Sequence, residues 1–145
     1  MRAKRRYITV EVIAPGASFT KGDIEKSVLE EVECIHGVFG RAAVTSFSVK
    51  YWNPVTCISL MRVFFGPHKL ITTVLPLITR ILGQPAQFHT IFIGATLKRC
   101  YLNIQKYEVS KLEKLWLNLS TDEERRKFKI HFTKELANVE RKSKR

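Results

Sequence analysis

The middle of this chain has no acidic side chains. Its 145 residues include no Asp or Glu between Cys34 and Tyr107. Two-metal nucleases need clustered carboxylates, and many general acid–base enzymes use carboxylates, so this gap argues against hydrolytic chemistry of these kinds. It leaves a positive field without internal neutralisation, which favours a polyanionic partner. The basic residues of the same stretch are Arg41, Lys50, Arg62, Lys69, Arg80, Lys98, Arg99 and Lys106.

Long apolar runs and cysteine frameworks are also missing. No apolar run reaches the ~18 residues that span a bilayer, and no apolar segment of a secretory signal follows the basic N-terminus, so we expect no membrane association. The 3 cysteines, an odd number at wide spacing, fit neither a disulfide framework nor a zinc site. We therefore expect reduced thiols and a cytosolic or nuclear protein.

Motifs for catalysis and cofactor binding are absent as well. The 4 histidines lack metal-binding spacing, and the chain has no Cys-x-x-Cys and no glycine-rich phosphate loop. A metal-free nuclease built on His36 and His68 remains an alternative, although isolated histidines are usually structural. We predict no catalytic residue, no metal site and no cofactor.

The charge that is present is strongly basic and unevenly distributed. Lys and Arg number 25 against 13 acids, for a formal net charge of +12 and a pI of about 9.9. Basic residues gather in the first six positions and from Arg125 to Arg145, whereas acids gather in residues 23–33 and 122–124. This excess of positive charge indicates what kind of partner the protein binds, but it does not indicate the fold.

Hydrophobic periodicity predicts the order strand, helix, strand, strand, helix, strand. This is the split βαβ order of an α+β, ferredoxin-like (RRM-like) sandwich, with a four-stranded antiparallel sheet and two helices on one face. The third strand is apolar on both sides and needs cover on both. Strands are predicted at residues 6–14, 41–52, 55–65 and 88–95.

Capping and breaking residues define the predicted helices. Thr20 and Asp23 form a capping-box pattern at the start of the first helix, and Gly37 is expected to end it. The second helix follows Gly66-Pro67, has Pro76 inside it as a kink, and is expected to end at Gly83.

Two further helices are predicted after the fourth strand, at residues 96–117 and from Thr121 onward. We infer that they cover part of the second sheet face, which we expect to carry Met61, Val63 and Phe65. The predicted organisation is one domain at 1–140, including a helical extension at about 96–140, followed by a basic tail at 141–145.

The candidate RNA-binding residues are cations interleaved with polar and aromatic side chains near strand ends. Cations neutralise phosphates, aromatic rings stack on exposed bases, and amides bond to base edges or sugars. Tyr51 also fits core packing, and Trp52 also fits a partly buried strand end. The candidates are Lys4, Arg5, Arg6, Tyr7, Arg41, Lys50, Tyr51, Trp52, Asn53, Arg62, Lys98 and Arg99.

Two known RNA-reading patterns are not matched. Residues 37–40 read Gly-Val-Phe-Gly, as in the backbone clamp of KH domains, but here they link a predicted helix to a predicted strand and contain no basic residue. A helix-ending turn is the favoured interpretation. The RNP motif of RRM sheets is absent from residues 55–65. Binding through phosphates and shape is therefore expected.

Several segments occur in a fixed order: Arg-Arg-Tyr-Ile at 5–8, His-Gly-Val-Phe-Gly at 36–40, residues 47–56, residues 74–79 and residues 94–100. Taken together, they resemble the Pop-five type protein subunit of ribonuclease P and ribonuclease MRP. The resemblance extends from about Arg5 to Leu117. The basic first strand and the Lys-Tyr-x-Asn segment of that family match Arg5, Arg6, Tyr7, Lys50, Tyr51 and Asn53.

The resemblance implies a ferredoxin-like core with added helices, in a non-catalytic, RNA-binding subunit. Its implied partners are the catalytic RNA, precursor tRNA in the holoenzyme, and a TIM-barrel-like protein subunit among others. Its implied location is the nucleus and nucleolus. Some eukaryotic members end in an acidic tail, whereas this chain ends in a basic one. Alternatives are a free-standing RRM-like RNA-binding domain and a ferredoxin-like domain that binds a small metabolite.

Overall fold

The computed structural model describes residues 3–16, 18–118, 121–130 and 133. The chain divides into two compact units, Met1–Thr96 and Leu97–Arg145. The boundary falls where the helical extension was expected to begin, and folding as one domain stays a prediction. Within the described residues, no helix combines the length and apolar character needed to cross a bilayer.

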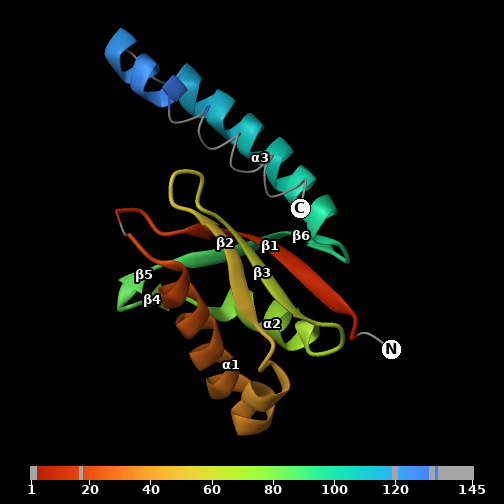
Figure 1. The fold of residues 1–145 in the computed structure, drawn as a ribbon. Coiled ribbons are helices and arrows are strands. Elements are labelled where there is room, and N and C mark those ends of the chain that lie inside the picture. The colour runs from red at the N-terminus through yellow and green to blue at the C-terminus, as the bar shows by residue number, and fades with distance from the viewer. Residues whose placement is uncertain (1–2, 17, 119–120, 131–132, 134–145) are drawn as a thin grey trace. The chain divides into compact units, whose positions relative to one another are not determined.

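The first unit has the predicted ferredoxin-like architecture (Figure 1). Its four-stranded sheet is antiparallel in the order β2-β3-β1-β6, with α1 and α2 on one face. A small hairpin, β4–β5, precedes the last strand of the sheet. The elements are β1 (Arg5–Ile13), α1 (Lys21–Ala43), β2 (Ser48–Asn53), β3 (Ile58–Phe64), α2 (His68–Val74), a 3₁₀ turn η1 (Leu75–Leu77), β4 (Arg80–Ile81), β5 (Gln84–Pro85) and β6 (Gln87–Gly94).

The hydrophobic core lies between the sheet and its two helices. Alternation in β1 directs Ile8, Val10 and Val12 into it, as predicted, and Ile8 lies opposite Met61 of β3. Each buried aliphatic side chain contributes on the order of 2 kcal/mol. The expectation that Met61 and Val63 face away from the helices is wrong, because the register pairs Met61 with Ile8 in this core.

The opposite face of the sheet carries a second set of mostly apolar side chains. Thr9 of β1 lies opposite Leu60 of β3, and Tyr51 and Asn53 of β2 lie opposite Leu60 and Ile58. Cover of this face by the C-terminal helices stays a prediction.

Helix α1 begins with the predicted capping box. The Asp23 amide donates to Thr20 Oγ1 at 3.3 Å, and the Thr20 amide donates to Asp23 Oδ2 at 2.9 Å. These bonds satisfy two amides at the first turn, which helix geometry leaves without backbone partners. Ile24, Val28 and Val32 then form the buried stripe.

Side chains of α1 also cap the outer edge of β2. Glu25 Oε2 accepts a hydrogen bond from the Val49 amide at 3.3 Å, and Lys21 Nζ donates to the Lys50 carbonyl at 3.4 Å. β2 is an edge strand of the sheet, and unpaired edge groups are templates for pairing with other chains. The helix thus occupies hydrogen-bonding groups that would otherwise recruit a foreign strand.

Helix α1 extends further than the sequence indicated. Gly37 interrupts it with φ 73° and ψ −169°, but the chain regains helical geometry and continues to Ala43. The prediction that Gly37 ends the helix is therefore correct only as a kink. The predictions that a strand begins at Arg41 and that the Gly-Val-Phe-Gly segment links a helix to a strand are wrong. The kink is compact, because a Cβ on Gly40 would lie 2.3 Å from the Cβ of His36.

A bulge and a proline account for two further differences. The register of β2 against β3 shifts between Val49 and Tyr51, which turns Tyr51 to the face opposite Val49. Pro76 lies in the 3₁₀ turn that follows α2, so the helix ends at Val74 instead of continuing to Gly83. Gly83, with φ 75°, instead lies between the strands of the β4–β5 hairpin.

The second unit begins with α3 (Leu97–Leu117), close to the predicted helix at 96–117. A further helical stretch covers residues 122–130, and the Glu124 amide donates to Thr121 Oγ1 at 3.3 Å, as expected of a helix cap. The predicted basic tail at 141–145 lies outside the described residues.

Substitution of Gly40 by Ala should destabilise the protein by about 1–3 kcal/mol, because the added methyl group meets the backbone-anchored Cβ of His36. Gly22→Ala is the matched control, since its nearest neighbour is Thr20 Oγ1 at 3.7 Å, and it should be neutral or stabilising by roughly 0.5–1 kcal/mol. Urea denaturation of both variants measures the difference. Equal stabilities would contradict the tight packing at the kink.

Candidate nucleic-acid interface

Cationic and aromatic side chains gather at one end of the central strands. The register places Arg5 opposite Phe64 and Tyr7 opposite Arg62, and the Phe65 amide donates to the Lys4 carbonyl at 2.8 Å. Pairing of the start of β1 with the end of β3 therefore assembles residues that are about sixty positions apart in sequence. We call this the basic–aromatic patch, and it wraps around the end of the sheet: Arg5, Arg62 and Phe64 lie on the face away from the helices, whereas Arg6 and Phe65 lie on the helix side. Its members are Lys4, Arg5, Arg6, Arg62, Phe64, Phe65, His68 and Lys69.

Arginine side chains of the patch lie over aromatic rings. The Arg6 guanidinium carbon is 4.4 Å from the centroid of Phe65, and that of Arg5 is 6.0 Å from the centroid of Phe64. Phe65 stacks on His68 with centroids 5.3 Å apart and planes 20° apart. The two phenylalanines remain 37% and 50% exposed. Flat rings beside fixed guanidinium groups suit nucleobases and phosphates together.

His68 extends this stack with a neutral ring. Its Nδ1 accepts a hydrogen bond from the Gly66 amide at 3.0 Å. Burial, followed by the nearby charges of Arg6 and Lys69, lowers the pKa of His68 below its ordinary value. An uncharged imidazole offers a stacking surface, while Arg6 and Lys69 beside it supply the positive charge.

The cations of the patch are available to an external anion. Lys4, Arg5, Arg6, Arg62 and Lys69 form no ion pair with any other residue that the structure describes. A small depression of about 80 Å³, lined by Arg5, Ser46, Arg62, Val63 and Phe64, lies at this end of the sheet. Phosphate oxygens are the natural ligands of such unneutralised guanidinium groups.

The histidines considered for catalysis have separate partners. His36 Nε2 lies 3.3 Å from Thr73 Oγ1, whereas His68 contacts Gly66 and Phe65. In the described part of the chain, no three His, Cys, Asp or Glu side chains gather as metal ligands would.

The predicted residues of β2 serve the fold instead of lining the patch. Trp52 packs against the hydrophobic core and donates from Nε1 to the Phe19 carbonyl at 2.9 Å. Asn53 accepts from the Val55 amide at 2.9 Å and lies 3.4 Å from the Tyr51 hydroxyl. The Lys50 carbonyl accepts a hydrogen bond from Lys21 Nζ. RNA contacts by Lys50, Tyr51, Trp52 and Asn53 stay predictions.

Of the remaining predicted residues, Tyr7 lies beside the patch and the other three lie elsewhere in the chain. Arg41 lies beyond the α1 kink and pairs with Glu33 at 3.0 Å, with both side chains largely exposed. Tyr7 is half-buried opposite Arg62. Lys98 and Arg99 are exposed in the first turn of α3, in the second unit. RNA contacts by these four residues also stay predictions.

Sequence reasoning missed Phe64, Phe65, His68 and Lys69. The signal was an aromatic pair at the end of an apolar strand, directly before Gly66-Pro67. Their significance depends on the register, which brings Arg5 and Arg6 beside them, and no local pattern encodes that register.

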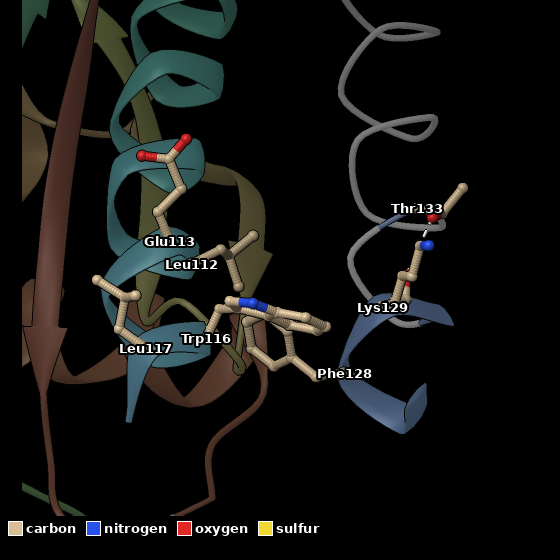
Figure 2. Close-up of a pocket in the computed structure, with 7 residues that line it drawn as sticks. All are labelled: Leu112, Glu113, Trp116, Leu117, Phe128, Lys129 and Thr133. Atoms are coloured by element: carbon tan, nitrogen blue, oxygen red, sulfur yellow. Dashed lines mark hydrogen bonds between the residues drawn. The ribbon is translucent and has the colours of Figure 1, made fainter. Parts of the chain in front are cut away.

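The second unit contains an apolar pocket of about 590 Å³ (Figure 2). Trp116 of α3 and Phe128 of the following helical stretch face each other there, with centroids 5.9 Å apart, and Arg125 lies 5.7 Å from the Trp116 centroid. Its polar groups are few, and the Thr133 hydroxyl donates to the Lys129 carbonyl at 2.9 Å. The lining residues are Leu112, Glu113, Trp116, Leu117, Phe128, Lys129 and Thr133.

The first unit is thus a ferredoxin-like sheet with cationic and aromatic side chains at one end, and comparison with known families shows which family it belongs to. Residues 6–105 match the model of the Rpp14/Pop5 family, so the chain belongs to this family. That result confirms the resemblance inferred from the sequence.

Relatives from several organisms are ribonuclease P/MRP protein subunits. The ribonuclease P/MRP protein subunit POP5 of Bos taurus is 29% identical over 143 residues, covering 92% of this chain and 84% of the relative. The Homo sapiens protein of that name is 29% identical over 134 residues, covering 86% and 82%. A chain in the cryo-EM structure of yeast ribonuclease MRP aligns with a TM-score of 0.55 at 11% identity, covering 79% of this chain and 98% of that one, which supports the fold.

Replacing Arg6 with Gln should raise the pKa of His68 toward its ordinary value, because one of the positive charges that disfavour its protonation is removed. NMR titration of the imidazole measures the change. Arg62→Gln is the matched control and should leave this pKa in place, since Arg62 is not among the groups that shift it. A His68 pKa unmoved by Arg6→Gln would contradict the described geometry.

Proposed function

We propose that this chain is a non-catalytic, RNA-binding protein subunit of ribonuclease P and ribonuclease MRP. The observation that carries the proposal is the unneutralised basic–aromatic patch in a member of the Rpp14/Pop5 family. In the holoenzymes it supports the active shape of the catalytic RNA. Ribonuclease P matures the 5′ end of precursor tRNA, and ribonuclease MRP processes precursor rRNA.

The patch would act on RNA through two kinds of contact. The guanidinium and ammonium groups neutralise backbone phosphates, with release of counterions. Phe64, Phe65 and His68 offer rings to unpaired bases, and such stacking contributes about 1–3 kcal/mol per base. Neither contact reads a sequence strongly, which suits recognition of a folded RNA by its shape.

Catalysis is assigned to the RNA and not to this chain. Support comes from the lack of carboxylates between residues 34 and 107, and from the separate, structural partners of His36 and His68. Further proposed partners are precursor tRNA in the holoenzyme and other protein subunits, including a TIM-barrel-like one. The proposed location is the nucleus and nucleolus, which imaging of a fluorescent fusion would test.

Affinity purification of the tagged full-length chain from its own cells tests the function. We expect one or two dominant structured RNAs, together with cleavage of precursor tRNA at its 5′ end. A broad mixture of RNAs without cleavage would contradict the proposal. It would favour the alternative of a free-standing RRM-like RNA-binding domain.

Neutralising two patch arginines should weaken RNA binding and its salt dependence. For Arg5→Gln with Arg6→Gln, the slope of log K against log salt should fall by about 0.7–0.9 for each phosphate that the protein no longer neutralises. The measurement is a filter-binding titration of the full chain with transcribed ribonuclease P RNA at several salt concentrations.

Lys26→Gln is the charge-matched control for each arginine. Lys26 lies on α1, 3.8 Å from Glu30, and its replacement should leave the slope nearly unchanged. An unchanged slope in the arginine variant, or an equal fall per charge in the Lys26 variant, would remove the patch from the RNA interface.

A further inference from the structure

The α1 kink exposes two large apolar side chains. Directly after Gly37, Val38 is 74% exposed and Phe39 is 92% exposed. Single exposed apolar residues are common on protein surfaces. An almost fully exposed phenylalanine beside a second exposed apolar residue, however, contributes little to the stability of the fold. The groove, the rigidity and the charge of the surrounding surface therefore indicate what kind of partner these two residues contact.

A groove opens beside the exposed pair. Its volume is about 340 Å³, and residues from both arms of the kinked helix and from the loop before β2 line it. Most of its lining is apolar, with charged groups only from Glu25 and Arg41. The lining residues are Glu25, Leu29, Val38, Arg41, Ala42, Val44, Thr45 and Phe47.

This surface is held in a fixed shape before any partner arrives. Gly37 supplies the left-handed backbone of the kink, and Gly40 packs directly on His36. His36 Nε2 lies 3.3 Å from Thr73 Oγ1 of α2, and Arg41 is paired with Glu33 across the kink. A preorganised surface loses little conformational entropy on binding.

The helix that contains the kink is acidic, unlike the protein as a whole. The chain carries a formal +12, whereas α1 contains five acidic and three basic residues, and three of these acids, Glu30, Glu31 and Glu33, lie within about two turns of Gly37. RNA is disfavoured at such a surface, and a Lys- and Arg-rich protein surface is attracted to it. The acidic residues of α1 are Asp23, Glu25, Glu30, Glu31 and Glu33.

We propose that the kink of α1 is a protein-docking site for a partner with a basic rim around an apolar pocket. Phe39 enters that pocket, and an apolar side chain of the partner fills the groove beside Val38. Central aromatic anchors of this kind carry much of the binding energy of an interface. The docking site is distinct from the basic–aromatic patch, and it rests on the proposed function in that protein subunits are among the proposed partners.

Site-specific photo-crosslinking in the intact assembly tests the site. A benzoylphenylalanine at position 39 of the full chain should crosslink to one co-purifying protein, at a Lys- or Arg-rich peptide. The matched control carries the same group at position 77, because Leu77 is an apolar residue 55% exposed elsewhere in the first unit. Crosslinks to RNA, to a second copy of this chain or to an acidic peptide, or none above the control, would overturn the proposal.

Removal of the Phe39 ring tests whether this docking site acts independently of RNA binding. Phe39→Ala should weaken binding to the crosslinked protein by at least ~30-fold, whereas Leu77→Ala should not. Both variants should keep the thermal stability and the affinity for ribonuclease P RNA of the natural chain, since the patch is untouched. Reduced RNA affinity in Phe39→Ala, or undiminished protein binding, would overturn the docking site without bearing on the patch.

Discussion

The register between β1 and β3 governs both the core and the binding surface. It pairs Ile8 with Met61 inside the core and Arg5 with Phe64 at the end of the same two strands. Side chains alternate along a strand, so a slip by one residue would expose the aliphatic set and scatter the cations. The stability of the core and the proposed binding of a polyanion therefore depend on one alignment, because burial of the aliphatic side chains also positions the arginines.

The two proposed binding surfaces of the first unit differ in charge. Lys4, Arg5 and Arg6 approach the aromatic end of β3, where the described chain offers them no carboxylate partner. Acidic residues instead concentrate on α1, where Phe39 projects into solvent. A polyanion and a basic protein would then occupy different surfaces of the same small fold without competing.

Periodicity and capping patterns were sufficient to predict the strand order, the capping box and the start of α3. They were insufficient at Gly37, because a glycine that breaks a helix does not show whether helical geometry resumes. They also failed at Pro76, where the apolar spacing continues although the helix has ended. Of the candidate site, Lys4, Arg5, Arg6 and Arg62 were identified, but Phe65 and His68 depend on tertiary register, which no local pattern records.

The side chains that cap β2 have a consequence for how the chain folds during synthesis. Lys21 and Glu25 precede the strand whose edge they occupy, so they leave the ribosome before it. β3, on the other side of β2, emerges later. The Val49 amide and the Lys50 carbonyl on the outer edge of β2 thus find their partners in a segment that has already been synthesised, whereas the inner edge must wait for β3.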